Sequence, residues 1–185
     1  ATNAILSLTD EQRQNGVITA SGGNHGLGVT FAASLVGVPA YIYLPTTTPP
    51  SKVETLKQLG ATTVLHGDAW DEANQLALQV AEENNIAYIH PFDNPNVMAG
   101  QATIATELLE QMPEIDMLVT SIGGGGLISG IASAIHHQSP NTRVIGVETI
   151  GADSMSQSLA NGKIITLDAI TSIANTLGAK STAKR

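Results

Sequence analysis

The sequence predicts an α/β fold with doubly wound parallel sheets, and three observations predict it. Short apolar runs rich in β-branched residues alternate along the chain with longer stretches of helical periodicity. Several runs are apolar at successive positions, as expected for parallel strands that are buried on both faces. Two of the strand-to-helix junctions are rich in glycine, as at the ligand-binding edge of an open α/β sheet.

The predicted elements alternate as strand and helix over most of the chain. The six predicted strands are Val17–Ala20, Ala40–Leu44, Thr62–Leu65, Ala87–His90, Met117–Ser121 and Arg143–Glu148. The predicted helices are Ala4–Arg13, His25–Leu35, a helix from Ser51 to Gly60, one from Asp68 to Asn84, Ala99–Gln111, Leu127–His137 and a shorter one near Ser154.

Local signals bound several of these helices. Ser51 followed by Glu54 has the pattern of a capping box, in which each side chain accepts from the other residue's backbone N–H. Gly60 ends that helix, because glycine readily adopts the left-handed conformation found after a helix. Pro113 stops the helix that precedes it, since proline cannot continue the hydrogen-bond ladder.

The composition excludes several classes of function. The chain has 185 residues, which suits one domain or two small ones, and its net charge of −8 repels the phosphates of nucleic acids. There is no run of about 18 apolar residues, so no membrane span is expected. With no cysteine, disulfides and thiolate chemistry are excluded. These features predict a cytoplasmic protein.

The first glycine-rich junction is Ser21–Gly26, which follows an apolar strand and opens a helix. The N-terminus of a helix offers free N–H groups and a positive dipole end to an anion. Glycine allows the backbone to approach a ligand closely, and the side chains of Ser21 and Asn24 add hydrogen-bonding groups. An ordinary turn, with Asn24 as a helix cap, explains the same pattern about equally well.

The second junction contains four consecutive glycines, Gly123–Gly126, again between an apolar strand and a helix. Successive backbone N–H groups that converge on one point form a nest for an anion such as phosphate. A flexible linker is the alternative explanation. Linkers have polar flanks, whereas this segment is flanked by Leu118-Val119 and Leu127-Ile128. The pattern therefore favours phosphate binding.

Five stretches of the sequence, in order, carry a resemblance to a known family. They are Thr19–Gly26, Pro91–Asp93 with Ala99–Ile104, Gly123–Gly126, Val147–Ser154, and Gly162–Lys163 followed by Ile170–Ala174. Together they resemble the fold-type II pyridoxal-phosphate enzymes, whose fold is like that of the tryptophan synthase β chain. The members they resemble are the serine and threonine dehydratases and serine racemase, and the last stretch is most similar to serine dehydratases.

The resemblance implies a role for each matching residue. Asn24 would bind the pyridoxal 3′-oxygen, and Ser21, Gly22 and His25 would hold the substrate carboxylate. The cofactor phosphate would be held by the backbone amides of Gly123, Gly124, Gly125, Gly126 and Leu127. A cation, K⁺ or a divalent ion, would be bound by Glu148, the carbonyl of Ala152 and Ser154, a set of oxygen ligands that suits hard cations.

The reaction that the resemblance implies is β-elimination, which converts L-serine or L-threonine to a 2-oxo acid and ammonia. Serine racemase has a second serine directly after the first serine of its loop, where it acts as an acid and base. This position is Gly22 here. Glycine cannot transfer a proton, so elimination is favoured over racemisation. The resemblance also implies a homodimer with an amino-acid substrate.

The lysine that carries the cofactor in this family is expected just before Ala1. The lysines that the chain does contain stand in other contexts and are predicted to be surface residues: Lys52, Lys57, Lys163, Lys180 and Lys184. The sequence therefore reads as a fragment that alone would bind pyridoxal phosphate weakly and have negligible activity. By analogy, residues 1–15 begin a large domain, residues 16–93 form a small mobile domain, and residues 94–185 are part of the large cofactor-binding domain.

Three other functions remain open at this point. The first is an amino-acid isomerase like serine racemase. The second is a non-catalytic module that binds a phosphorylated ligand. The third is an NAD-binding oxidoreductase domain, since Gly124 and Gly126 open a helix and Glu148 ends a strand about 20 residues later. The dinucleotide pattern fails at its third glycine, where this chain has Ser129.

Overall fold

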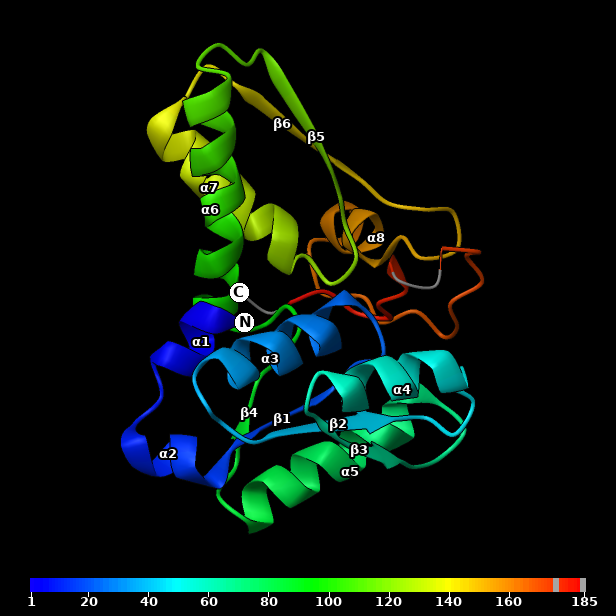
Figure 1. Ribbon diagram of the computed structural model, residues 1–185. Helices are drawn as coiled ribbons and strands as arrows, with labels where there is room; N and C mark the ends of the chain where they lie inside the picture. Colours follow the sequence, from blue (N-terminus) through cyan, green and yellow to red (C-terminus); the bar gives the residue numbers. More distant parts are fainter. Residues whose placement is uncertain (175–176, 184–185) are drawn as a thin grey trace. The chain divides into compact units, whose positions relative to one another are not determined.

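The computed structural model describes residues 1–174 and 177–183. The chain divides into two compact units, Ala1–Pro91 and Phe92–Arg185 (Figure 1). Each unit contains one parallel sheet and one of the two glycine loops. Contacts group residues 1–15 with the first unit, where α1 (Thr2–Leu6) packs against α3 (Asn24–Leu35). The assignment of residues 1–15 to a large domain stays a prediction.

The first unit contains a four-stranded parallel sheet in the order β3-β2-β1-β4. Its strands are β1 (Val17–Ala20), β2 (Ala40–Leu44), β3 (Thr62–Leu65) and β4 (Ala87–Tyr88). The chain runs outward from β1 to β3 and then crosses to β4 on the other side of β1. The strand order therefore reverses between β1 and β4, and ligands bind at the carboxyl ends of strands at such a switch point.

Helices cover both faces of this sheet. Besides α1 and α3, the first unit contains α2 (Asp10–Asn15), α4 (Pro50–Gln58) and α5 (Trp70–Glu83). In Figure 1, α3 and α4 lie on one face of the sheet and α5 lies on the other. All four residues of β1 are buried, which explains why three of them are apolar and the fourth, Thr19, is β-branched.

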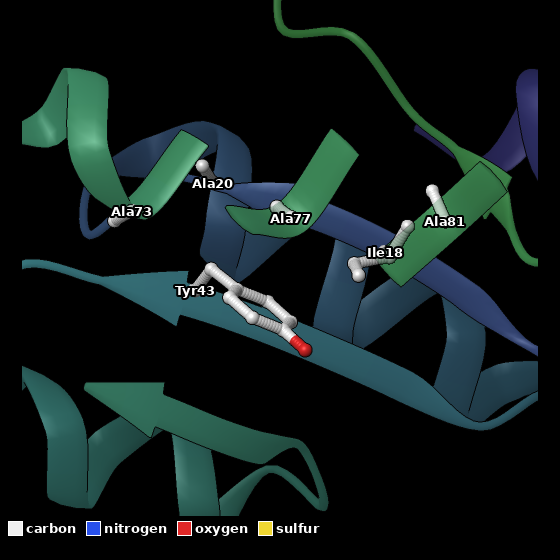
Figure 2. Packing of buried hydrophobic residues seen from close by; sticks show 6 residues of the cluster. All are labelled: Ile18, Ala20, Tyr43, Ala73, Ala77 and Ala81. Carbon is white, nitrogen blue, oxygen red and sulfur yellow. The ribbon is translucent and has the colours of Figure 1, made fainter. Parts of the chain in front are cut away.

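The helix α5 packs against β1 and β2 through a stripe of alanines. Ala73, Ala77 and Ala81 recur every four residues and are buried against a cluster that includes Ile18 and Tyr43 (Figure 2). Residues at this spacing lie on one face of a helix. Because alanine has the smallest side chain that still favours a helix, the stripe lets α5 lie close to the strands.

The second unit contains β5 (Met117–Ser121) and β6 (Arg143–Val147), which form a parallel pair. Its helices are α6 (Pro95–Gln111), α7 (Gly126–Gln138) and α8 (Ser154–Asn161). The helices α6 and α7 pack side by side, and a Cβ at Gly130 would collide with the carbonyl of Met98. Ala105, Ile131 and Ile135 form the buried core between these elements. Among the described residues, no helix has both the length and the apolar character needed to cross a bilayer.

The predicted α/β class and parallel pairing are confirmed, but the prediction of one helix over Ala4–Arg13 is wrong. The helix α1 ends at Leu6, and α2 begins at Asp10. Thr9 caps α2, because its hydroxyl accepts from the backbone N–H of Gln12 at 3.2 Å while the Gln12 side chain accepts from the N–H of Thr9 at 3.0 Å. This pair is a capping box in which glutamine replaces glutamate.

The capping box predicted at Ser51 and Glu54 is also wrong. The helix α4 begins one residue earlier, at Pro50, and no side chain caps it. Proline suits this position because its fixed φ is already helical and its missing N–H would have no partner there. The helix α6 begins at Pro95 for the same reason rather than at Ala99, and the strands predicted to end at His90 and Glu148 end at Tyr88 and Val147.

Candidate functional site

Each glycine loop leads from a strand into a helix whose N-terminus has no side-chain cap. In the first unit, α3 begins at Asn24 after Gly23. In the second unit, α7 begins at Gly126 after Gly125. The N–H groups of a helix's first turn have no acceptor inside the helix, so both loops present free donors at a positive dipole end.

Two helices of the second unit, α6 and α8, have these donors satisfied by nearby side chains, whereas α1 and α4 have no side-chain cap. The Asn94 side chain accepts from the N–H groups of Asn96 and Val97 at the start of α6, at 2.9 and 3.1 Å. The Glu148 carboxylate accepts from the N–H groups of Met155 and Ser156 at the start of α8, at 2.8 and 2.7 Å. At the two glycine loops, no side chain caps the helix, so the first-turn donors are available to an external anion.

The first loop, Ser21–Gly26, is folded by short internal contacts. The Ser21 hydroxyl accepts from the Gly23 N–H at 3.3 Å. A Cβ at Gly26 would collide with the Ser21 carbonyl, so only glycine allows this turn. Ser21 is half-buried and Asn24 is exposed at the first position of α3. The two polar side chains predicted to meet ligands are thus on one loop, at the carboxyl end of the central strand β1.

This loop lies at the switch point of the sheet, beside the end of β4. The Ile89 N–H donates to the Ile18 carbonyl at 2.9 Å, which continues the pairing of β4 with β1. The Nε2 atom of His25 lies 3.0 Å from the Ile89 carbonyl. The His25 side chain therefore ties the start of α3 to the end of β4. The role expected for His25 in holding a substrate carboxylate stays a prediction. Because its ring contacts Ile89, the backbone N–H of His25 is the donor available for that role.

Burial lowers the pKa of His25 to about 4, because a charged imidazole loses its hydration there. The ring is therefore neutral at pH 7, and it donates its Nε2–H to Ile89 in the tautomer that this contact requires. The proximity of His90 acts in the same direction as burial on the pKa of His25. Because this buried position favours the neutral form of His25, the stability of the loop depends on pH.

The stability of the fold is expected to fall in acid because of His25. The unfolded chain binds a proton below the ordinary histidine pKa of about 6.5, whereas the folded chain resists protonation down to about pH 4. Between these values, wild type should lose on the order of 2 kcal/mol of unfolding free energy that a His25→Gln variant keeps. Urea unfolding at pH 7.0, 5.5 and 4.5 measures this difference in pH dependence.

The exposed His66 provides the matched control for this experiment. A His66→Gln variant should lose stability with falling pH as wild type does. If His25→Gln shows the same pH dependence as wild type, the buried neutral state assigned to His25 is wrong.

The second loop, Gly123–Leu127, combines an unusual backbone with tight packing. Gly125 has a φ of +98°, in the left-handed region that favours glycine. A Cβ at Gly124 would collide with the Phe92 ring, and one at Gly126 would lie 2.7 Å from the Phe92 Cα. The Leu127 side chain packs against the core of the second unit, so this residue can offer a ligand only its backbone amide.

The three residues predicted to bind a cation lie near one another in the second unit. Both carboxylate oxygens of Glu148 accept backbone N–H groups at the start of α8. Ala152 is buried and donates its N–H to the Thr149 carbonyl at 3.0 Å. The Ser154 hydroxyl donates to the Ala179 carbonyl at 3.2 Å. A cation there would share the Glu148 carboxylate and the Ser154 hydroxyl with these partners, and the site stays a prediction.

The lysines that the structure describes lie on the surface, as the sequence predicts. Lys52, Lys57, Lys163 and Lys180 are exposed, and Lys184 lies outside the described residues. Among the described residues there is also no cluster of three histidine, cysteine or acidic side chains that could hold a metal. The predicted cation site consists mostly of neutral oxygens, so the absence of such a cluster does not test it.

Two residues at these loops had no role predicted from the sequence, although Phe92 lies in one of the stretches that carry the family resemblance. Phe92 fills the space that Gly124 and Gly126 leave open. Trp70, the only tryptophan of the chain, donates its indole N–H to the Ala20 carbonyl at 2.8 Å, directly before the first loop. A single tryptophan at the start of a helix is the one sequence signal that could have indicated the second contact.

Comparisons with known proteins agree on one family. A family profile described as "Pyridoxal-phosphate dependent enzyme" matches residues 1–185. An L-threonine ammonia-lyase from Geobacter sulfurreducens is 46% identical over 180 residues, which cover 97% of this chain and 45% of the relative. A serine racemase from Oryza sativa subsp. indica is 42% identical over 179 residues, which cover 97% of this chain and 53% of the relative.

A solved structure of the processed form of threonine deaminase isoform 2 from Solanum lycopersicum superposes with a TM-score of 0.96 at 40% sequence identity. The match covers 99% of this chain and 53% of that one. The chain thus spans about half the length of the curated relatives it matches. The profile match over its whole length shows that the chain belongs to the pyridoxal-phosphate dependent enzymes.

Proposed function

We propose that this chain is part of an ammonia-lyase that uses pyridoxal phosphate to convert L-serine or L-threonine to a 2-oxo acid and ammonia. The observation that carries the proposal is the pair of uncapped helix N-termini, each at the end of a strand. One would hold the anionic phosphate of the cofactor, and the other the carboxylate of the substrate. The named activities of the relatives, threonine ammonia-lyase and threonine dehydratase, support this assignment.

The residues of the second loop fit a phosphate. The left-handed Gly125 turns the backbone so that the amides of the loop and of the first turn of α7 can converge, as in anion nests. The loop is held in place because the Ala183 N–H donates to the Gly124 carbonyl at 2.8 Å. Hydrogen bonds from neutral amides to a phosphate are charge-assisted and are stronger than those between neutral groups.

The residues of the first loop fit a substrate carboxylate and a pyridine ring. The first-turn amides of α3 and the Ser21 side chain can bind carboxylate oxygens, while the exposed Asn24 amide can hydrogen-bond the 3′-oxygen of the ring. When bound, pyridoxal phosphate supplies a ring that stabilises negative charge at the α-carbon of the substrate. The task of these protein groups is to hold the amino acid in one orientation for proton removal.

The base that removes the α-proton is not assigned within this chain. Lys52, Lys57, Lys163 and Lys180 are exposed, and neither glycine loop contains a lysine. Elimination rather than racemisation is proposed because Gly22 has no group that could return a proton to the opposite face. The match to serine racemases keeps racemisation as the second candidate function. Because the chain belongs to the pyridoxal-phosphate dependent enzymes, we no longer favour the dinucleotide-binding alternative. The serine at the third glycine position already disfavoured it.

A product assay tests the proposal. The complete gene product, supplied with pyridoxal phosphate, is incubated with L-serine or with L-threonine. We expect a 2-oxo acid and ammonia in equal amounts, and D-serine at less than about one tenth of the 2-oxo acid, because one face lacks an acid. Formation of D-serine faster than 2-oxo acid would favour the racemase instead, and no turnover of either amino acid would contradict both.

The remaining expectations are part of the same proposal. We propose L-serine and L-threonine as the candidate substrates, a cytoplasmic homodimer as the assembled form, and K⁺ or a divalent cation near Glu148, Ala152 and Ser154. Replacing K⁺ by Na⁺ in the product assay, with and without a divalent ion, distinguishes the candidate cations.

A further inference from the structure

The carboxyl end of β1 is held by a side chain from the helix that covers the opposite face of the sheet from α3. Trp70, the first residue of α5, donates its indole N–H to the Ala20 carbonyl at 2.8 Å. The two residues are 50 positions apart in sequence. Ala20 is the last residue of β1, and its peptide bond leads directly to Ser21 of the first glycine loop.

The packing of α5 brings this donor into reach. Ala73, Ala77 and Ala81 lie against Ile18 and Ala20, as Figure 2 shows, so the helix axis lies close to β1. The indole of Trp70 extends from the N-terminal end of this stripe to the end of the strand. One turn later on α5, Asn74 accepts from the Tyr88 hydroxyl, which ties the same helix to β4. Both polar contacts therefore fix α5 to the two strands that flank the switch point.

The Trp70 contact depends on a directed hydrogen bond as well as on packing of the ring. The residue is 38% exposed, so burial of the ring is incomplete. Its polar edge nevertheless reaches a backbone carbonyl of a fully buried strand residue. A buried carbonyl needs a donor, and tryptophan supplies one without a charge and with few rotatable bonds.

We propose that Trp70 is a positioning residue that sets the orientation of the Ala20–Ser21 peptide and, through it, of the loop Ser21–Gly26. The part of this inference that concerns the substrate rests on the proposed function, because this loop is assigned there to the carboxylate. The part that concerns the loop's geometry stands on the hydrogen bond alone. Loss of the indole N–H loosens the loop while the ring continues to fill its place.

The most direct test replaces one atom. Trp70 is the only tryptophan of the 185-residue chain, so a tryptophan-auxotrophic host can incorporate β-(3-benzothienyl)alanine, in which sulfur replaces the indole N–H, at this position alone. Amide hydrogen exchange is then followed by NMR. The reporters are the Gly23 N–H, bound to the Ser21 hydroxyl, and the Leu27 N–H, bound to the Gly23 carbonyl.

We expect these two amides to exchange about 3- to 10-fold faster in the analogue, as for the loss of one hydrogen bond. The Leu59 N–H at the end of α4, bound to the Thr55 carbonyl, is the internal control and should exchange at the wild-type rate. Unchanged exchange at Gly23 and Leu27 overturns the proposal. So does an equal acceleration at Leu59, because that result describes general loosening of the unit.

A second variant, Trp70→Phe in the complete gene product, separates positioning from folding. We expect the KM for L-serine to rise about 3- to 10-fold with kcat within about 2-fold, since a carboxylate contact acts equally in the ground and transition states. The control is Tyr41→Phe, which removes a polar hydrogen from another aromatic residue of the same sheet. It should leave KM and kcat unchanged. An unchanged KM in Trp70→Phe contradicts the substrate part. If the protein turns over no amino acid, the proposed function fails, and the exchange measurement still decides the loop's geometry.

Discussion

Gly126→Ala is expected to weaken the binding of pyridoxal phosphate by more than about 100-fold. This factor corresponds to the loss of two or more charge-assisted hydrogen bonds. The added Cβ would lie 2.7 Å from the Phe92 Cα and 2.9 Å from its carbonyl oxygen. These are backbone atoms that cannot rotate away, so the N-terminus of α7 must move. The amides that are proposed to hold the phosphate move with it. Equilibrium titration of the complete gene product with pyridoxal phosphate measures the affinity.

Gly28→Ala is the matched control for that substitution. Gly28 lies inside α3, and among the residues that the structure describes its Cβ would meet the Cβ of Ala1, at 4.0 Å, and no closer neighbour. We expect normal cofactor affinity and a gain of about 0.5–1 kcal/mol in unfolding free energy, because alanine favours a helix over glycine. Wild-type affinity in Gly126→Ala would show that the second loop does not hold the phosphate.

Gly22→Ser is expected to introduce racemisation. The new Cβ would lie 3.2 Å from the Leu44 Cδ2 and 3.6 Å from the Thr48 Cγ2, which are ends of side chains that can shift slightly. The hydroxyl would provide a proton donor at position 22, where glycine has none, and positioned acids and bases typically contribute about 100-fold or more to a proton transfer. We expect the ratio of D-serine to 2-oxo acid formed from L-serine to rise at least about 10-fold. Chiral chromatography of the reaction mixture measures that ratio.

The control for this gain is Gly22→Ala. Alanine adds the same Cβ and the same contact with Leu44, but it has no hydroxyl. It should change the rate of elimination without adding D-serine. If alanine and serine change the ratio equally, the effect comes from loop geometry and the acid–base role given to this position is wrong.

The local parts of the fold were predictable from sequence because their causes are local. Strands β1, β2, β3 and β5 have the predicted bounds, since each is a short run of apolar or β-branched residues. The two glycine loops were located by their glycines and by the strands that precede them. The break at Thr9 does not follow from the helical periodicity, because glutamine takes the place of the more usual glutamate in its capping box.

The contacts between distant segments could not be predicted, because no local pattern encodes them. The strand order depends on which strand β4 pairs with, and that pairing joins residues about 70 positions apart. The requirement for glycine at positions 124 and 126 comes partly from Phe92, about 30 residues earlier. The sequence pattern predicts only phosphate binding for these glycines, whereas the structure shows that packing against Phe92 demands them as well.

The central claim is that the second glycine loop binds the phosphate of the cofactor, and one comparison tests it most directly. Pyridoxal phosphate and pyridoxal share the ring and the aldehyde and differ only in the phosphate. Titration of the complete gene product with each compound should show pyridoxal phosphate binding at least about 100-fold more tightly, because several backbone amides of Gly123–Leu127 contact the phosphate. Equal affinity for the two compounds would contradict the account.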